Sequence, residues 1–485
     1  MSNAIEGLQP ERVWKYFAEI SKIPRGSKDE AAVARYVLET AKSLGLKAKQ
    51  DDYGNVIVRK PATPGREHVG SLALQGHLDM VCEKNANIAH DFSKDPIEIV
   101  RKGNVLMANG TTLGADNGIA VATNLAILES SDLEHGPLEL LFTIDEETGL
   151  TGAANLKPDF LASRTLINLD SEEEGELFVG CAGGRNTTGT WTLDDEKVSP
   201  KFSAMTLMVK GLKGGHSGLE IEKGRGNSIK IINRVLIALA EFGARLSALN
   251  GGNKSNAIPR EAEALLFVPK KKVEEAQAVV VKFNETIRAE LSTVEPDLAI
   301  SLKESSENNK SKVVTQSQQR KICQTLSAMP HGVTKMSAEI SWLVETSTNL
   351  AVIQTGKKEI VLTTSQRSSV ASEMEEICQT VRSVLELGKA SVEQADGYPG
   401  WKPNLDSPIL KVARETYQSL FGKEPQVKAV HAGLECGIIG EKFPGMDMVS
   451  FGPTLRGVHS PDECIYIDSV DRFWIFLLGI LRNFH

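Results

Sequence analysis

The sequence lacks long apolar runs, long basic runs and cysteines in metal-site or disulfide-framework spacing. Residues 473–481, the longest apolar stretch near the C-terminus, fall well short of the roughly 18 residues expected of a membrane span. The net charge of −8 does not suit a nucleic acid partner. Residues 1–10 do not have the basic and apolar pattern of a secretory signal, and the six cysteines are scattered. We therefore expect a cytoplasmic protein with reduced thiols and no membrane segment.

Three common catalytic motifs are also absent. The chain contains no HExxH zinc motif and no GxxxxGK(S/T) phosphate-binding loop. Residues 215–219, with the sequence Gly-His-Ser-Gly-Leu, lack the final glycine of the GxSxG nucleophile elbow. These absences remove P-loop enzymes and serine hydrolases from the candidate classes.

The length of 485 residues exceeds what one hydrophobic core usually serves, so we expect two domains. Apolar strands and amphipathic helices up to Gly184 are typical of an α/β domain. After Gly184 the pattern becomes that of an α+β domain, in which a doubled β-α-β unit is one interpretation. The turn-rich segment at residues 397–403 marks the point where the chain returns to the first domain. The expected domains are a catalytic domain at residues 1–184 and 399–485, and an inserted domain at residues 185–398.

One acidic strand end organises the first domain. The apolar run at residues 138–144 ends in three successive carboxylates and is broken by Gly149. This pattern predicts a buried strand that delivers acids to the carboxyl edge of a sheet, where open α/β sheets bind ligands. Glu146 and Glu147 would repel each other if both ionised in one pocket. Either they point apart into solvent, or a cation lies between them.

Other segments supply further candidate ligands. His77 and Asp79 follow an apolar strand and lie two residues apart, so the carboxylate can orient the imidazole. Asp116 lies in a glycine-bearing loop before a helix, where it suits either a bridging ligand or an N-cap. Asp170 ends another apolar strand, and His459 lies in a loop before the C-terminal helix. Together these segments are more specific than any one of them.

The set contains two imidazoles and at least three carboxylates, which suit zinc, with cobalt and manganese as alternatives. Six candidate groups exceed the three protein ligands of one catalytic zinc ion. Two ions roughly 3.5–4 Å apart that share Asp116 would use these groups and leave one carboxylate as a base. The sequence therefore predicts a dinuclear metal site.

These motifs, in this order, resemble those of the dizinc aminoacylase and dipeptidase family of metallopeptidases. The resemblance covers essentially the whole chain and is carried by His77-Leu78-Asp79, Gly114-Ala115-Asp116-Asn117-Gly118, Glu146-Glu147, Asp170, Gly214-Gly215-His216-Ser217-Gly218 and His459. The acidic run at residues 170–176 and the segment at residues 431–437 favour the branch that cleaves Xaa-His dipeptides, such as carnosine-type substrates. The resemblance implies a zinc-exopeptidase type of α/β fold, with a mixed sheet covered by helices on both faces and an inserted lid or dimerisation domain.

The resemblance also implies a role for each candidate ligand. Two zinc ions would be held by His77, Asp116 and Asp170, and by Asp116, Glu147 and His459, respectively. Glu146 would act as the general base towards the water that bridges the two ions. Asp79 would orient His77.

The inserted domain supplies three further residues in this resemblance. His216 would stabilise the oxyanion, either within one chain or across a dimer. Arg367 is similar in position to the carboxylate-binding arginine of the family, and a guanidinium suits a C-terminal carboxylate. Asn256 resembles an asparagine of the family's substrate site, with a turn residue as the alternative. His431 and Glu435 either line the pocket or shape their loop. The implied partners are a dipeptide substrate and a second copy of the chain.

Two other functions remain open from the sequence. An N-acyl amino acid amidohydrolase or an aminotripeptidase would use the same metal core, but an unblocked dipeptide would not be its preferred substrate. A non-catalytic metal-binding or peptide-binding protein would have no need of the spare base Glu146 beside a complete ligand set. We therefore expect hydrolysis of unblocked dipeptides, preferably Xaa-His.

Overall fold

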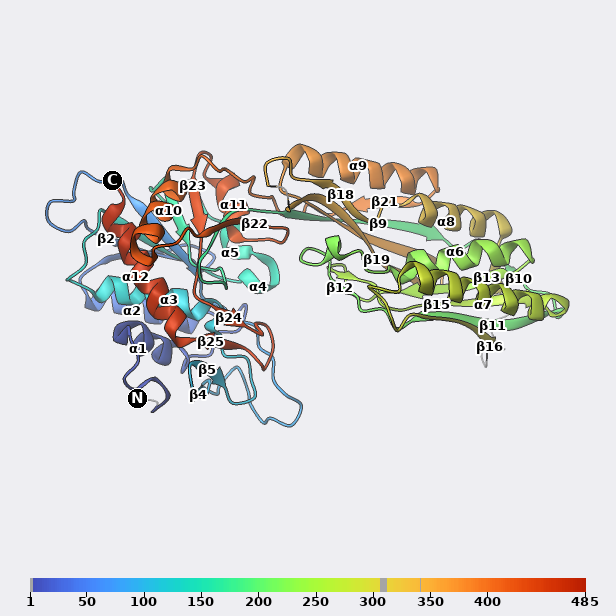
Figure 1. The fold of residues 1–485 in the computed structure, drawn as a ribbon, viewed down its shortest axis with the longest axis horizontal. Helices are drawn as coiled ribbons and strands as arrows, with labels where there is room; N and C mark the ends of the chain where they lie inside the picture. Colours follow the sequence, from blue (N-terminus) through green and yellow to red (C-terminus); the bar gives the residue numbers. More distant parts are fainter. Residues whose placement is uncertain (1–2, 306–311, 341) are drawn as a thin grey trace. The chain divides into compact units, whose positions relative to one another are not determined.

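The computed structural model describes residues 3–305, 312–340 and 342–485. The chain divides into two compact units (Figure 1). Unit 1 consists of Met1–Gly180, Trp401–Ala429 and Leu434–His485, and unit 2 consists of Cys181–Gly400 and Val430–Gly433. The short segment Val430–Gly433 was expected in the first domain. It belongs to unit 2 because Ala182 donates its N–H to the carbonyls of Val430 and Ala432, and because the His431 ring contacts Ser347.

Unit 1 is built on an eight-stranded sheet. In spatial order its strands are β1 (Lys47–Gln50), β2 (Val56–Lys60), β6 (Leu138–Thr143), β3 (Leu72–His77), β7 (Thr165–Asn168), β23 (Asp447–Ser450), β8 (Glu176–Cys181) and β22 (Gln426–Val430). β1, β2 and β6 pair antiparallel, whereas β3 pairs in parallel with both β6 and β7, and β23 pairs in parallel with β7. The sheet is therefore mixed, as the expected fold class requires.

Parallel pairing explains why the central strands have continuous apolar sequences. Every residue of β3 and β6 is buried, as expected for strands that are covered on both faces. The carboxyl ends of β6, β3 and β7 lie beside one another, because these strands are neighbours and run in the same direction. Any side chains that follow these three strands are brought together at one edge of the sheet.

Helices pack on this sheet and on one another, with α3 against β3 and α10 against β23. The helices of unit 1 are η1 (Asn3–Ile5), α1 (Glu11–Ile20), α2 (Ala31–Ser43), α3 (Ala115–Glu129), α4 (Glu146–Gly149), α5 (Thr151–Ala154), α10 (Pro408–Phe421), α11 (Glu435–Lys442) and α12 (Ile467–Asn483). The start of α10 follows from its sequence, since Ser407 caps the N–H of Leu410 and Pro408 occupies the first turn. A four-stranded sheet completes the unit, with β24 (Leu455–Arg456), β25 (Cys464–Tyr466), β5 (Val105–Ala108) and β4 (Ile99–Lys102).

Unit 2 is built on a nine-stranded sheet. Its strands in spatial order are β16 (Ala299–Glu304), β11 (Phe202–Lys210), β15 (Ala262–Pro269), β13 (Arg245–Gly251), β19 (Val344–Thr355), β20 (Glu359–Ser368), β9 (Gly183–Thr192) and β21 (Ser391–Gln394), with β18 (Gly332–Met336) paired to β19. Two short ladders accompany it, β10 (Asp195–Lys197) with β17 (Lys312–Val314), and β12 (Gly215–His216) with β14 (Ala257–Ile258).

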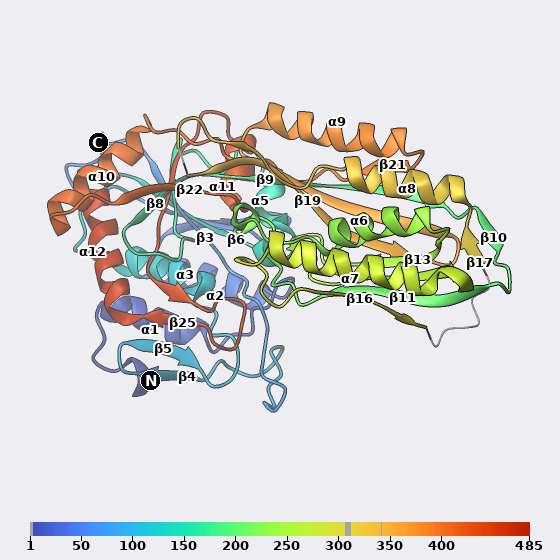
Figure 2. The same ribbon diagram turned by 45° about the vertical axis from the view of Figure 1, so that its right-hand side comes forward.

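The helices of unit 2 lie along one face of its sheet (Figure 2). They are α6 (Ser228–Glu241), α7 (Val273–Glu290), α8 (Gln316–Ala328) and α9 (Ala371–Leu387), with the short turns η2 (Ile221–Lys223) and η3 (Lys270–Lys272). Asn227 caps α6 by accepting the N–H groups of Ile229 and Lys230. Among the helices that the structure describes, none is both long and apolar enough to cross a bilayer.

Candidate active site

The carboxyl edge of the unit 1 sheet collects most of the predicted ligands. His77 is the last residue of β3, Glu146 and Glu147 follow β6, and Asp170 follows β7. Asp116 enters from the first turn of α3, where its backbone is not helical, with φ −80° and ψ 112°. His459 enters from the loop between β24 and β25. The structure therefore brings together all six groups that the sequence singled out, from segments far apart along the chain.

Asp116 faces both imidazoles, one with each carboxylate oxygen. Its Oδ1 lies 3.1 Å from His77 Nε2, and its Oδ2 lies 3.2 Å from His459 Nε2. His77 Nε2 is also 3.3 Å from Asp170 Oδ1, and His459 Nε2 is 3.0 Å from Glu147 Oε2. Two triplets, each with ligand atoms within 4.8 Å of one another, therefore share Asp116: His77/Asp116/Asp170 and Asp116/Glu147/His459.

Asp79 orients the imidazole of His77 and the turn that carries the two glutamates. Its Oδ1 lies 3.2 Å from His77 Nδ1, so a proton on Nδ1 leaves Nε2 free to face the other carboxylates. The same carboxylate accepts the N–H groups of Glu146 and Glu147 at 3.0 and 3.2 Å. Burial raises the pKa of Asp79, but the hydrogen bonds from His77 and Ser27 outweigh it and lower the pKa to about 2.

Glu146 is close to the two triplets that share Asp116 but belongs to neither of them. It forms a separate group with His77 and Glu147. Burial raises its pKa well above the usual range for a glutamate; His77 opposes this shift, whereas Asp170 and Glu435 add to it. A half-buried carboxyl with a raised pKa beside a cluster of candidate ligands has the properties of a proton acceptor in catalysis.

The donor set fits divalent cations. Burial raises the pKa of Asp170 to about 7; the charges of Asp116 and Glu147 add to this shift, and His77 opposes it. Glu147 Oε1 is buried and has no hydrogen-bond partner among the described residues. Cations held between the imidazoles and carboxylates would neutralise the excess negative charge and give this oxygen a partner.

Glu435 lies inside unit 1, next to the strands that carry these ligands. Its Oε2 accepts hydrogen bonds from Gln75 Nε2 at 2.5 Å and from Thr143 Oγ1 at 2.7 Å, and the side chain is fully buried. Burial raises its pKa to about 7. Gln75 is on β3 and Thr143 ends β6, so Glu435 connects the two strands close to the site.

The predicted residues of the inserted domain lie in unit 2. His216 is on β12, and its Nδ1 accepts the N–H groups of Gly218 and Leu219, both at 3.2 Å. Its proton is therefore on Nε2. Burial, together with the positive charge of Arg367, lowers the pKa of His216 to about 4. At neutral pH the ring is thus uncharged and presents an N–H donor at Nε2.

Arg367 is a buried cation without an ion pair among the described residues. It lies on β20 with 6% of its surface exposed, and its Nη1 donates to Tyr398 Oη at 3.1 Å. Its Nε has no hydrogen-bond partner within the part of the chain that the structure describes. A buried guanidinium with free donors is suited to a ligand carboxylate.

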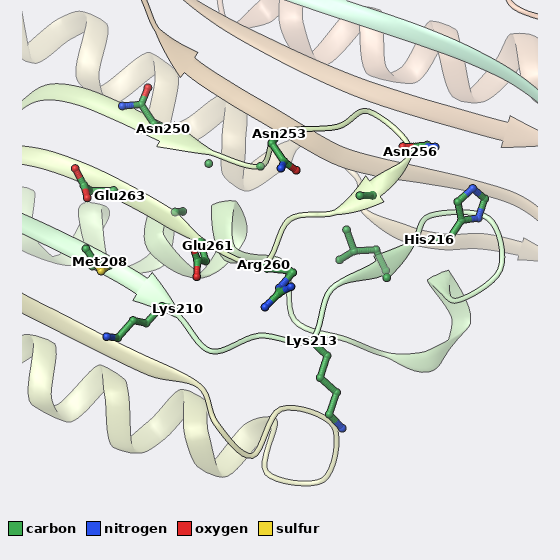
Figure 3. A pocket seen from close by; sticks show the side chains of 16 residues that line it. Met208, Lys210, Lys213, His216, Asn250, Asn253, Asn256, Arg260, Glu261 and Glu263 are labelled. Atoms are coloured by element: carbon green, nitrogen blue, oxygen red, sulfur yellow. The ribbon is translucent and has the colours of Figure 1, made fainter. Parts of the chain in front are cut away.

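Asn256 and His216 both line a cavity of about 790 Å³ in unit 2. In Figure 3 the two side chains lie at the same end of this cavity, whereas Arg260 is further along it. They are neighbours because β12 pairs with β14, and because Ser217 donates its N–H to the carbonyl of Asn256 at 2.8 Å. The structure therefore brings together these two predicted residues in unit 2.

A model of Peptidase family M20/M25/M40 matches residues 73–483 of the sequence. This chain belongs to that family. It is 43% identical over 477 residues to the "Cytosol non-specific dipeptidase" of Escherichia coli (strain K12), and the match covers 98% of each chain. It is 41% identical to an aminoacylhistidine dipeptidase from Vibrio alginolyticus, whose crystal structure matches with a TM-score of 0.91 over 99% of this chain and 98% of the other.

More distant peptidases share the fold. A tripeptidase from Staphylococcus aureus matches with a TM-score of 0.57 at 16% identity, over 98% of each chain. Membership of the M20/M25/M40 family identifies the chain as a peptidase, which confirms the expected enzyme class and the resemblance stated from the sequence motifs. It removes the non-catalytic binding protein from the main alternatives.

Two charged residues of this M20/M25/M40 member were not identified from the sequence, although both contact the backbone of the site. Arg25 donates to the carbonyls of Leu78 and Asp79, and Glu463 accepts N–H groups at the start of α3. Because their partners are main-chain atoms, no pair of side chains in the sequence indicates the role of either residue. The one indication in the sequence was that Glu463 lies four residues after the candidate ligand His459.

Three buried or half-buried imidazoles in unit 2 are expected to make this peptidase sensitive to acid. Burial lowers the pKa of His216 and of His331 to about 4, and that of His431 to about 3. The unfolded chain takes up protons near the ordinary pKa of about 6.5, before the folded chain does. Stability is therefore complete above about pH 6.5 and is lost as the pH falls towards 4.

The change His331→Gln isolates one of these imidazoles. Because one proton is then no longer taken up on unfolding, the free energy of unfolding should fall less steeply between pH 6.5 and 4.5, by at most about 1.4 kcal/mol per pH unit. Urea unfolding at several pH values measures the slope in both proteins. Identical slopes would contradict the lowered pKa of His331, whatever the difference in absolute stability.

Proposed function

We propose that the protein hydrolyses unblocked dipeptides, preferably Xaa-His, at the site in unit 1, with two divalent metal ions as cofactors. The observation that carries this proposal is the placement of Asp116 between two imidazoles, with Glu146 left over beside a complete ligand set. Two similar proteins are named as dipeptidases, one non-specific and one for aminoacylhistidine. Both names describe an enzyme that acts on dipeptides. The preference for a dipeptide with a C-terminal histidine is the more specific part of the proposal.

One ion would be held by His77, Asp116 and Asp170, and the other by Asp116, Glu147 and His459, with zinc favoured over cobalt and manganese. When bound, two divalent ions polarise the scissile carbonyl and lower the pKa of a water molecule. Asp79 holds His77 in the orientation in which Nε2 faces this site. Its hydrogen bonds to the N–H groups of Glu146 and Glu147 fix the turn that carries the base.

Glu146 takes the proton of the attacking water on its carboxylate and passes it to the departing amine. His216 donates from Nε2–H to the oxyanion that develops on the substrate carbonyl, which its neutral state and fixed tautomer allow. Arg367 binds the C-terminal carboxylate of the dipeptide through its free donors, and Asn256 contacts the substrate beside His216. Unit 2 would then serve as the lid or dimerisation domain.

The test measures the release of free histidine from glycyl-histidine and β-alanyl-histidine by metal-loaded protein. Glycyl-leucine is the control for side-chain preference, and N-acetyl-glycyl-histidine is the control for the free amine. We expect hydrolysis of both histidine dipeptides at a higher kcat/KM than of glycyl-leucine, and none of the acetylated peptide. Preference for the acetylated peptide would instead support an amidohydrolase, and preference for a tripeptide would support an aminotripeptidase.

Assembly and location are further expectations of this proposal. None of the six cysteines forms a disulfide bond in the part of the chain that the structure describes, and the Escherichia coli relative is named for the cytosol, which supports a cytoplasmic enzyme. The homodimer stays a prediction of the motif resemblance. Sedimentation equilibrium at micromolar concentration tests it, and a mass equal to one chain would contradict it.

A further inference from the structure

Glu463 holds the loop that carries Asp116. Its carboxylate is only 2% exposed, although no ion pair involves it among the described residues. Instead it accepts four successive main-chain N–H groups at the start of α3: Oε2 accepts from Leu113 (2.7 Å) and Gly114 (2.9 Å), and Oε1 accepts from Ala115 (2.8 Å) and Asp116 (3.2 Å). One buried carboxylate thus satisfies four consecutive donors of a loop.

The local backbone explains why these donors need an external acceptor. Asp116 and Asn117 have non-helical φ and ψ values, so the first residues of α3 do not form a regular helical turn. Buried N–H groups without partners are costly, and a carboxylate is a strong acceptor for them. Glu463 follows the candidate ligand His459 by four residues. Its hydrogen bonds therefore connect the segment that carries His459 to the loop that carries Asp116.

Arg25 holds the same loop through the carbonyl of Gly114. Its guanidinium is 2% exposed and donates through Nη1 to the carbonyls of Leu78 and Asp79, at 3.0 and 3.1 Å, and through Nη2 to the carbonyl of Gly114. Leu78 and Asp79 directly follow His77. Arg25 therefore connects the segment that carries His77 to the loop that carries Asp116.

The glycines of the Asp116 loop make room for this guanidinium. A Cβ atom on Gly114 would lie 2.6 Å from Arg25 Nη2, and one on Gly118 would lie 2.5 Å from the same atom. Gly114 also has a positive φ of 68°, which disfavours other residues. The spacing of these two glycines around Asp116 is thus explained by a buried arginine rather than by a ligand.

We infer that Arg25 and Glu463 are positioning residues that fix Asp116 relative to both imidazoles before any metal ion binds. The inference rests on the proposed function in one respect, that Asp116 is the ligand shared by two ions. Neither residue belongs to the described groups of candidate metal ligands. They act through the main chain of residues 113–116. Arg25 connects this loop to the segment of His77, and Glu463 connects it to the segment of His459.

Two variants test the inference, with a matched control. Glu463→Gln keeps the shape but replaces one acceptor oxygen by an NH₂ group that faces N–H donors. Arg25→Lys keeps the charge but loses the geometry that reaches three carbonyls. Glu139→Gln is the control, because Glu139 is 3% exposed and its Oε2 also accepts main-chain N–H groups, from Ala162 and Ser163. It lies near the start of β6, away from the ligands at the other end.

The measurements are zinc affinity, by competition with a chromophoric chelator, and amide hydrogen exchange of residues 113–116 in metal-free protein. We expect Glu463→Gln and Arg25→Lys to bind zinc about 10–100-fold more weakly and to exchange these amides faster. Glu139→Gln should keep the wild-type zinc affinity even if it unfolds at a lower temperature. Because the contacts of both positioning residues are with main-chain groups, kcat of both variants should recover at saturating zinc.

Wild-type zinc affinity in Glu463→Gln and Arg25→Lys would overturn the inference. So would fast exchange of residues 113–116 in the metal-free wild-type protein, a measurement that needs no variant to fold. Equal loss of zinc affinity in Glu139→Gln would overturn it too, since the effect would then follow from stability alone. Failure of the proposed function is distinguishable, because the wild-type protein would then bind no pair of ions or hydrolyse no dipeptide.

Discussion

Glu146→Gln is expected to lower kcat for dipeptide hydrolysis by about 10²–10⁴-fold, the usual contribution of a general base, while both metal ions remain bound. Glutamine has the size of glutamate but cannot take the proton of the attacking water. The site is complete without this side chain, because the two triplets that share Asp116 do not include it. Loss of turnover with retention of metal is therefore the signature that we expect.

Metal analysis must accompany the kinetics, because Glu146 also lies within ligand distance of His77 and Glu147. Loss of one ion in Glu146→Gln would show that it is a ligand and would contradict the role of base. Glu172→Gln is the matched control. Glu172 is another acid near the site, and burial raises its pKa to about 8 with help from Asp116 and Asp170, yet it belongs to none of the described ligand groups. Its replacement should leave kcat nearly unchanged.

The grouping of the candidate ligands could be predicted from the sequence because most of them follow a local pattern. His77 and Asp170 each come at or just after the end of an apolar strand, and parallel strands place their carboxyl ends at one edge. The two-residue spacing of His77 and Asp79 was sufficient to predict their contact, which the structure has at 3.2 Å. Strand order was needed as well, because only neighbouring parallel strands, as β6, β3 and β7 are, bring side chains at their ends within ligand distance of one another.

Asp116 shows the limit of such patterns. The sequence allowed both an N-cap and a bridging ligand, and the choice depends on backbone angles that no local pattern specifies. In the structure the residue leaves the helical region, and its two oxygens face His77 and His459 rather than the N–H groups of α3. The N–H groups at the start of α3 are instead capped by Glu463, which is almost 350 residues away from Asp116 in the sequence.

Residues that act on main-chain atoms could not be predicted, for the same reason. Arg25 and Glu463 bind carbonyl and N–H groups, which are identical at every position of the chain. The contacts that place the segment Val430–Gly433 in unit 2 were equally hidden in the sequence, because they too are main-chain hydrogen bonds, from Ala182 to the carbonyls of Val430 and Ala432. Side-chain chemistry is visible in a sequence, whereas main-chain pairing depends on the fold.

Asp116→Asn is expected to weaken the binding of both metal ions, whereas Asp170→Asn and Glu147→Gln should each weaken the binding of only one. The reason is geometric, because the two oxygens of Asp116 face different imidazoles, while Asp170 lies beside His77 and Glu147 lies beside His459. The loss of affinity should exceed the roughly 10–100-fold that removal of an outer partner costs. Chelator-stripped wild-type protein should be inactive and should recover with two ions per chain.

Stepwise titration of each stripped variant with cobalt, followed by its visible absorption and by bound metal per chain, separates the cases. Asp170→Asn and Glu147→Gln should each take up one ion with near wild-type affinity and show little turnover, because dinuclear chemistry needs both ions. Asp116→Asn should take up neither ion at the concentrations that saturate the wild type. One ion held at wild-type affinity by Asp116→Asn would mean that the two sites do not share this carboxylate, and the dinuclear arrangement would have to be abandoned.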